Sequence, residues 1–299
     1  MDKMKVALIG LDTSHAVEFP RWMQDPAVPA ALRVRDLCAT RCLRFETPFQ
    51  DRKGLDERQA YLERIGVMVT EEFDAAVADC DALMIEINDP ARHLEYFEKC
   101  AGLGLPIFLD KPFADTPENA RRIMRIAEKN NVRFFTSSAL RFDADLEEAV
   151  SQKVSPASTV VWGPVGRAAA GSSIVWYGVH AFEMLQRIMG RGALSVLTSE
   201  DGNGYVCHVA YAENRRGIVE LTRNCWNYGG IIWDNGEHEL HFRVSNRIPF
   251  YRMLLAEIAG FFRGQRRGVP PEDSLEVMSM LAAADRSARS RRAEPVFPG

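Results

Sequence analysis

Short apolar runs and longer helical segments alternate along the first half of the chain. Apolar runs without helical spacing lie at 6–9, 32–39, 67–70, 81–87, 105–110 and 132–138. Segments with helical spacing lie between them, at 13–23, 55–65, 72–78, 90–104 and 116–131. Strands that alternate with helices predict a parallel sheet with right-handed crossovers. We therefore expect a doubly wound α/β domain over residues 1–138, with ligands at the carboxyl ends of its strands.

The second half has a different rhythm, in which strands follow one another directly. Alternating apolar positions predict strands at 193–199, 205–212, 217–226, 230–234 and 238–244. Helices are expected at 144–153, 177–189, 250–264 and 272–291. Asp-Asn-Gly-Glu at 234–237 is typical of a hairpin turn, and neighbouring strands usually pair antiparallel. This pattern predicts an α+β domain over residues 139–299 with a mostly antiparallel open sheet.

Composition narrows the class of protein. The chain has 299 residues, of which 46% are hydrophobic and 26% charged, and its formal net charge is −4. This mildly acidic balance argues against a nucleic-acid partner. No apolar stretch is long enough to span a membrane, and the charged N-terminus does not read as a signal peptide. The six cysteines are scattered, so we expect no metal site, and we expect a reducing compartment, the cytoplasm.

The first predicted strand runs into Gly10, where a dinucleotide-binding loop would continue as Gly-x-Gly-x-x-Gly. Asp12 stands at the second glycine position and His15 at the third. A carboxylate beside a pyrophosphate places like charges close together, which lowers dinucleotide affinity unless Asp12 turns away. The opposite interpretation is also open. The hydroxyls of Thr13 and Ser14, with the free N–H groups of the following helix, suit a phosphate.

The end of the second predicted strand bears on the choice of cofactor. NAD-binding domains of this class often carry an acidic residue there, which holds the ribose hydroxyls. Here Thr40 and Arg41 follow Ala39, and no carboxylate is present. A hydroxyl and a guanidinium suit a 2′-phosphate, so the sequence favours NADP over NAD. The alternative is an exposed arginine on a connection.

Three segments resemble one known family. The stretch LPIFLDKPFADTPENARRI (105–123) resembles the Glu-Lys-Pro region of the Gfo/Idh/MocA family, which includes glucose–fructose oxidoreductase and inositol dehydrogenase. WYGVHAFEML (176–185) is similar to that family's Asp-x-Gly-x-His-x-x-Asp signature, and DALMIEINDPARH (81–93) to its strand on the nicotinamide side. The resemblance implies a Rossmann-like dinucleotide-binding domain, a substrate domain, and a homo-oligomer, either a dimer or a tetramer.

The resemblance also implies roles for individual residues. Lys111, followed by Pro112, would reach the substrate hydroxyl and the nicotinamide ribose, where an ammonium stabilises a developing alkoxide. His180, expected on the first turn of a helix that begins after Gly178, would act as acid and base. Asn88 would contact the nicotinamide or form a turn.

Pro90 ends the same strand segment on the cofactor side. The chain also departs from the family pattern in the second signature. Trp176 replaces the family's first Asp and Glu183 its last. Tyr177 offers a hydroxyl next to the lost carboxylate, and the ring of Trp176 offers a surface for stacking on substrate.

The sequence therefore favours an NAD(P)-dependent oxidoreductase that transfers hydride between a nicotinamide cofactor and a sugar, cyclitol or related hydroxy compound. Two alternatives stay open. One is a non-catalytic small-molecule-binding or regulatory protein that retains the scaffold, to which Asp12 and Trp176 point. The other is a lyase or hydrolase that uses a tightly held cofactor.

Overall fold

The computed structural model describes residues 3–152, 155–234, 236 and 238–296. The chain forms two compact units. The first unit comprises Met1–Ala114, Asn119–Thr136 and Tyr251–Pro271, and the second comprises Asp115–Glu118, Ser137–Phe250 and Glu272–Gly299. The sequence placed 251–271 in the second domain, but this segment packs in the first unit, where Phe261 contacts Phe135 with ring centroids 4.9 Å apart.

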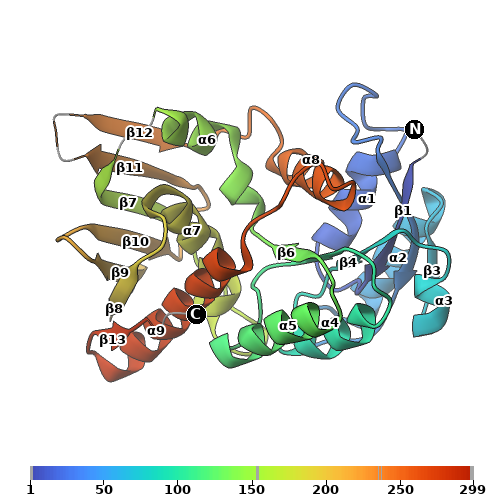
Figure 1. Cartoon of the computed structure of the whole chain (residues 1–299), viewed down its shortest axis with the longest axis horizontal. Helices are drawn as coiled ribbons and strands as arrows, with labels where there is room; N and C mark the ends of the chain where they lie inside the picture. The colour runs from blue at the N-terminus through green and yellow to red at the C-terminus, as the bar shows by residue number, and fades with distance from the viewer. Residues whose placement is uncertain (1–2, 153–154, 235, 237, 297–299) are drawn as a thin grey trace. The chain divides into compact units, whose positions relative to one another are not determined.

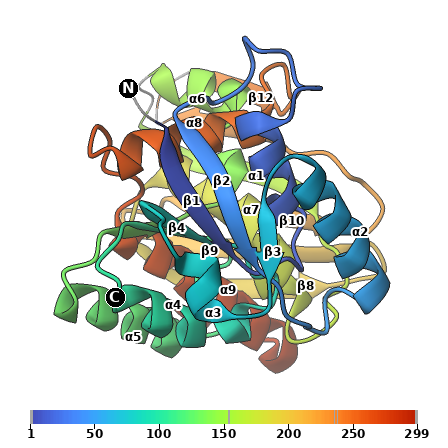
Figure 2. The same ribbon diagram turned by 90° about the vertical axis from the view of Figure 1, so that its right-hand side faces the viewer.

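The first unit is built on a six-stranded sheet in the order β3-β2-β1-β4-β5-β6. Its strands are β1 (Met4–Ile9), β2 (Leu37–Leu43), β3 (Met68–Thr70), β4 (Ala82–Ile85), β5 (Ile107–Leu109) and β6 (Phe134–Thr136). All neighbouring strands are parallel, as expected for a doubly wound domain. Figure 2 shows β4, β1, β2 and β3 side by side in this order.

Helices cover both faces of this sheet (Figure 1). They are α1 (His15–Gln24), α2 (Arg52–Arg64), α3 (Phe73–Val77), η1 (Pro90–Arg92), α4 (His93–Ala101), α5 (Pro117–Lys129) and α8 (Phe250–Phe262). Consecutive strand residues point to opposite faces, and β6 makes this visible. The Phe134 ring lies 5.1 Å from Phe97 of α4, whereas Phe135 faces Phe261 of α8. Hence α4 and α8 lie on opposite faces.

The second strand begins later than its pattern predicts. The segment before Leu37 forms turns, and β2 pairs with β1 from Met4↔Leu37 to Ile9↔Leu43. Thr40 and Arg41 therefore lie inside the strand and not at its carboxyl end, and Arg41 Nη1 donates to the Ala75 carbonyl at 3.1 Å. The prediction that Thr40 and Arg41 form the strand tip was wrong.

The second unit holds a mixed, mostly antiparallel sheet in the order β12-β11-β7-β10-β9-β8-β13. Its strands are β7 (Pro156–Pro164), β8 (Ala193–Glu200), β9 (Gly204–Tyr211), β10 (Arg216–Thr222), β11 (Gly229–Asp234), β12 (Glu239–Arg243) and β13 (Glu294–Pro295). Among the described strands of this second sheet, only β7 and β10 pair in parallel. The predicted hairpin turn at 234–237 includes residues 235 and 237, which lie outside the described residues.

The sequence pattern missed β7, although this strand lies between β11 and β10. Its apolar run is short and is bounded by Pro156 and Pro164. The helices of this unit are η2 (Ala139–Phe142), α6 (Ala144–Ser151), α7 (Ser173–Met189) and α9 (Pro271–Ser290). No helix in the described part of the chain has both the length and the hydropathy to cross a bilayer.

Helix α7 begins earlier than expected, because Ser172 caps it. The Ser172 hydroxyl accepts the Val175 N–H at 3.4 Å and donates to Asp285 at 2.6 Å. His180 therefore lies in the middle of α7 and not on its first turn, which corrects the sequence-based placement. Gly178 lies inside the helix. A Cβ at this position would lie 3.0 Å from Leu221 Cδ1 of β10. The missing side chain of Gly178 lets α7 approach the sheet closely.

Candidate active site

The loop between β1 and α1 starts with a residue that only glycine suits. Gly10 has φ +108°, and a Cβ there would overlap the Glu86 carbonyl oxygen and lie 2.8 Å from Ile87 Cγ1. The tight turn at the first position of the phosphate loop is thus retained. The turn brings the chain from the end of β1 to the start of α1.

Asp12, at the second glycine position, turns inward. Its carboxylate accepts the Asn88 N–H at 2.8 Å and the Thr47 hydroxyl at 2.7 Å, and only 1% of the residue is exposed. Burial raises the pKa of this carboxyl, while the two hydrogen bonds act in the opposite direction. Arg58 of α2 donates to the Leu11 carbonyl at 2.9 Å and adds a positive charge beside the loop.

The next two residues, Thr13 and Ser14, lead into α1. Thr13 is buried, and its hydroxyl accepts the His15 N–H at 3.3 Å. Ser14 is the exposed N-cap residue of α1, and its side chain makes no capping hydrogen bond. The first turn of α1 therefore begins directly after an exposed hydroxyl.

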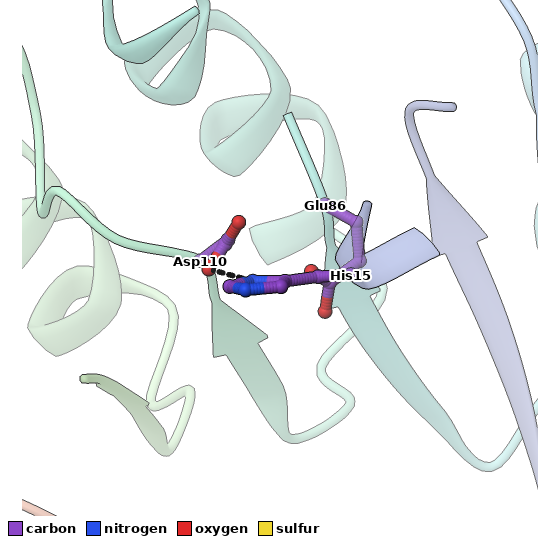
Figure 3. Close-up of side chains that lie close together, drawn as sticks. All are labelled: His15, Glu86 and Asp110. Atoms are coloured by element: carbon purple, nitrogen blue, oxygen red, sulfur yellow. Dashed lines mark hydrogen bonds and ion pairs between the residues drawn. The ribbon is translucent and has the colours of Figure 1, made fainter. Parts of the chain in front are cut away.

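His15 turns into the domain. On α1, His15 and Phe19 are four residues apart and share one helix face. On β5, Phe108 contacts Phe19, so Asp110, two residues further on, faces the same helix. His15 Nδ1 lies 2.8 Å from Asp110 Oδ1 (Figure 3). The Tyr251 ring packs edge-on against the imidazole at 5.0 Å.

Glu86 completes this buried group. Ile85 pairs with Leu109, so Glu86 and Asp110 leave adjacent strands side by side at their carboxyl ends. Figure 3 shows the Glu86 side chain pointing toward His15. One ligand-capable atom from each of His15, Glu86 and Asp110 lies within 4.8 Å of the others. In the described part of the chain, no donor reaches either Glu86 carboxylate oxygen or Asp110 Oδ2.

The two carboxyls of this group titrate in opposite directions. Burial raises the pKa of Glu86 well above its usual range, and the neighbouring Asp110 charge raises it further. Burial also acts to raise the pKa of Asp110. There, however, the charges of His15 and Lys111 and the hydrogen bonds from His15 and the Lys111 N–H prevail, and the pKa falls to about 2. Asp110 is thus ionised at neutral pH, whereas burial and the Asp110 charge both disfavour the ionised form of Glu86.

Lys111 follows Asp110 directly at the end of β5. The Lys111–Pro112 peptide bond is cis, and the Lys111 N–H donates to Asp110 Oδ1 at 2.7 Å. The ammonium Nζ lies 3.9 Å from Asp110 Oδ2. Only 6% of Lys111 is exposed, so its long side chain is held within the unit beside a buried carboxylate.

In the second unit, His180 is oriented by a serine that the sequence analysis missed. Ser138 Oγ lies 2.7 Å from His180 Nδ1, and either atom can donate, depending on the imidazole tautomer. Ser138 is itself fixed, because it caps η2 by accepting the Leu140 N–H at 3.2 Å. The hydrogen bond at Nδ1 fixes the orientation of the imidazole ring.

Glu183 lies one turn beyond His180 on α7 and holds the backbone of Ser138. It accepts a hydrogen bond from Arg141 Nη1 at 3.1 Å and from the Ser138 N–H at 3.4 Å. Arg141 Nη2 in turn donates to Asp273 at 3.3 Å. Burial raises the pKa of Glu183, against the charge of Arg141. The family's last acidic position is therefore occupied here by a carboxylate in a buried ion pair.

Replacing Arg141 by Met leaves Glu183 buried without its counter-charge. We expect Arg141→Met to lower the free energy of unfolding by about 3 kcal/mol at pH 7. The pKa of Glu183 in the folded state rises further above its ordinary value near 4.5. Protonated Glu183 makes its full contribution to stability below pH 4.5, and this contribution is lost as the pH rises through the pKa of Glu183 in the folded variant. The loss in unfolding free energy caused by the substitution therefore grows with pH. Urea unfolding at pH 4.5 and pH 7 measures it. Adding Glu183→Gln should recover most of the loss, and a deficit independent of pH would contradict this account.

Aromatic rings surround His180 in the second unit. Tyr177 packs edge-on against the imidazole at 5.2 Å, and Tyr228 lies 5.9 Å from it. Tyr177 also contacts Trp176 at 5.2 Å and Trp226 at 5.7 Å. Trp226 is 66% exposed. Such rings offer flat apolar faces of the kind that pack against the C–H faces of a ring substrate.

The structure thus brings together part of the predicted site and adds residues to it. In the first unit, Gly10, Asp12 and the Asn88 backbone meet, and Pro90 is the first residue of η1. Sequence reasoning missed the residues that support the expected ones: Arg58, Glu86, Asp110, Ser138 and Arg141. A signal for Glu86 was present, since it is the one charged residue in the apolar run LMIEI (83–87).

Sequence comparison gives a family match for the first part of the chain. Residues 4–138 match the model of an oxidoreductase family with an NAD-binding Rossmann fold, the Gfo/Idh/MocA family. The chain is also 23% identical, over 229 residues, to the rhizopine catabolism protein MocA of Rhizobium meliloti, which covers 64% of this chain and 71% of that protein.

Solved structures share the fold over the full length. The myo-inositol dehydrogenase of Lactobacillus casei, solved with NAD(H) and myo-inositol, has a TM-score of 0.83 at 12% identity and covers 100% of this chain and 98% of that one. The scyllo-inositol dehydrogenase of the same organism, solved with NAD(H) and scyllo-inositol, has a TM-score of 0.76 at 15% identity and covers 99% of both chains. At these identities the similarity shows the fold alone.

Proposed function

We propose that this chain is an NAD(P)-dependent dehydrogenase of a cyclitol, sugar or related polyol. The match of residues 4–138 to the Gfo/Idh/MocA oxidoreductase model supports this proposal. The observation that carries the proposal is that Lys111 and His180, which stand at the family's two signature motifs, are each held by a neighbouring side chain. Lys111 lies beside an ionised, buried Asp110, and His180 is held through Nδ1 by Ser138. Both signatures thus retain the groups that hydride transfer from an alcohol requires.

The loop residues fit a dinucleotide despite the loss of two glycines. Asp12 is turned inward and hydrogen-bonded to Thr47 and Asn88, so its charge is directed away from solvent. Burial also disfavours its ionised form. The Gly10 turn and the exposed Ser14 lead into the N-terminus of α1, a position that favours phosphate. Arg58 adds a guanidinium beside the loop.

In this proposal, the resemblance assigns a role at the substrate hydroxyl to each of Lys111 and His180. The Lys111 ammonium donates to the hydroxyl oxygen and stabilises the alkoxide that develops on it. His180 accepts the hydroxyl proton at Nε2, while Ser138 holds Nδ1 and keeps the ring in place. A bound nicotinamide supplies the hydride acceptor. The rings of Tyr177, Tyr228 and Trp226 give the substrate domain an apolar wall suited to a ring-shaped polyol.

Turnover of a polyol panel tests the proposal. The purified protein is incubated with NAD⁺ or NADP⁺ and with myo-inositol, scyllo-inositol or aldoses, and absorbance of the reduced nicotinamide is followed. We expect cofactor reduction with at least one ring polyol, abolished in His180→Ala. Binding of nicotinamide without turnover of any panel member would contradict a polyol substrate. Absence of both would favour a binding protein that retains the scaffold.

We further propose a preference for NADP, now on a different residue from the one that the sequence indicated. Arg44 follows β2 directly, at the carboxyl end where the ribose-binding residue of such domains stands. Its guanidinium is held by Asp56 and by Gln59, the latter at 2.6 Å. An arginine at this place suits a 2′-phosphate.

Arg58 is expected to contribute to dinucleotide affinity. Arg58→Gln removes the positive charge next to the loop, and we expect the Kd for the reduced cofactor to rise about tenfold, or about 1.4 kcal/mol. Fluorescence titration measures it. Arg52→Gln, an exposed arginine of the same helix, is the matched control and should leave the Kd unchanged. Equal effects of the two variants would show that only net charge matters.

We also expect the protein to form a homo-oligomer. The outer face of the second sheet leaves Leu197 of β8 and Val206 of β9 exposed, beside His208. Exposed apolar side chains on one sheet face are typical of a subunit contact. Sedimentation velocity at micromolar concentration should give a mass at least twice that of the 33.6 kDa chain. A monomer would contradict this expectation.

A further inference from the structure

We propose that His15, Glu86 and Asp110 form a binding site for a divalent transition-metal ion such as Mn²⁺ or Zn²⁺. This inference goes beyond hydride transfer and departs from the sequence-based expectation of no metal. The three side chains come from the start of α1 and the ends of β4 and β5, and Figure 3 shows them converging. One ligand atom of each lies within 4.8 Å of the others.

The donor set selects the class of ion. An imidazole nitrogen suits Zn²⁺ or Fe²⁺, and carboxylate oxygens suit harder ions such as Mn²⁺. Purely oxygen-preferring ions such as Mg²⁺ and Ca²⁺ gain nothing from the histidine. Three protein ligands also leave further coordination positions open, which is typical of a reactive site and not of a closed structural one.

Unpartnered atoms in the group are the observation that points to a ligand. Glu86 is fully buried, yet no donor among the described residues reaches either of its carboxylate oxygens. Asp110 Oδ2 is likewise buried without a hydrogen bond, although Lys111 Nζ lies 3.9 Å away. Buried polar atoms are rarely left unpaired in folded proteins. A cation bound by one atom of each side chain would give both buried carboxyls a partner.

The position of Lys111 leads to a prediction that would not apply to an acidic cluster without a neighbouring lysine. Its ammonium shares Asp110 with the proposed ion, so the two positive charges compete for the same carboxylate. Removing the ammonium while keeping a long apolar side chain should therefore tighten metal binding. Removing a ligand should weaken it. The two substitutions act in opposite directions on one affinity.

Calorimetric titration with MnCl₂ tests the site, using full-length protein that has been dialysed against chelator and holds no nicotinamide. Mn²⁺ is the first probe because the exposed Cys225 is a softer ligand that attracts Zn²⁺. We expect one Mn²⁺ per chain and a higher Tm in its presence. Glu86→Gln should weaken binding by about tenfold or more, and Lys111→Met should strengthen it several-fold.

Glu276→Gln is the matched control. Glu276 is half-buried and also has one unpartnered oxygen, but it lies in the second unit, where it accepts the Gly192 and Ala193 N–H groups. The Glu276→Gln variant should bind Mn²⁺ with the same affinity as the wild type. The proposal is overturned if folded wild-type protein binds no Mn²⁺ or Zn²⁺ at millimolar concentration, or if Glu86→Gln binds as tightly as wild type. Because no nicotinamide is present, this outcome is independent of whether the protein is a dehydrogenase.

Discussion

Lys111→Ala is expected to lower kcat for polyol oxidation by about a thousandfold while leaving the protein folded. In the proposed function, the ammonium of Lys111 acts at the reacting hydroxyl. Here it is held against a buried carboxylate, with Nζ 3.9 Å from Asp110 Oδ2. Alanine removes the charge and leaves the Asp110–His15 hydrogen bond of 2.8 Å in place. Nicotinamide absorbance with myo-inositol or scyllo-inositol measures the rate.

The control for this substitution is Lys129→Ala, at the exposed last turn of α5. It should leave kcat within twofold of wild type. Circular dichroism and urea unfolding show whether Lys111→Ala is folded, so that a lost rate is not mistaken for lost structure. If folded Lys111→Ala kept kcat within tenfold of wild type, the role of this lysine would be wrong.

Gly10→Ala is expected to have the largest effect on stability, about 3–5 kcal/mol. Two causes add together. The residue has φ +108°, which an alanine adopts only with strain. A Cβ would also overlap the Glu86 backbone carbonyl, and this atom is fixed by the strand ladder in which the Glu86 N–H donates to Ile9. Relief would require β1 and β4 to separate.

Gly66→Ala separates the two causes. Gly66 lies in the same unit with φ +90°, but a Cβ there meets nothing within 4 Å. It should cost only the backbone strain, about 1–2 kcal/mol. Urea unfolding of both variants measures the difference. Equal losses at the two positions would show that the contact with Glu86 is unimportant.

The fold of the first unit could be predicted because its signals are local. Buried strands of a parallel sheet are apolar runs, and helices with caps separate them. The boundary of β2 could not be, because the apolar residues at 32–36 look like strand residues and only the pairing of Leu37 with Met4 decides where the strand begins. The same holds for β7, whose place in the sheet depends on pairing with β10, more than fifty residues later.

The site was harder to predict, for a similar reason. Lys111 and His180 each belong to a short motif that is continuous in sequence, so a resemblance can find them. Their contacts with distant residues are not visible in such motifs: Ser138 lies 42 residues before His180, and His15 lies 95 residues before Asp110. Asp12 shows that residue type alone can also mislead. Its residue type suggests repulsion of a phosphate, and only the positions of Thr47 and Asn88 reveal that its carboxylate turns inward.

The central claim is that this altered loop still binds a nicotinamide dinucleotide, and fluorescence titration with NADPH and NADH tests it most directly. The account predicts saturable binding in the micromolar range, tighter for NADPH than for NADH, and weakened by Arg58→Gln. No binding of either cofactor at millimolar concentration to folded protein would contradict it. The chain would then have the Rossmann-like fold without binding the cofactor.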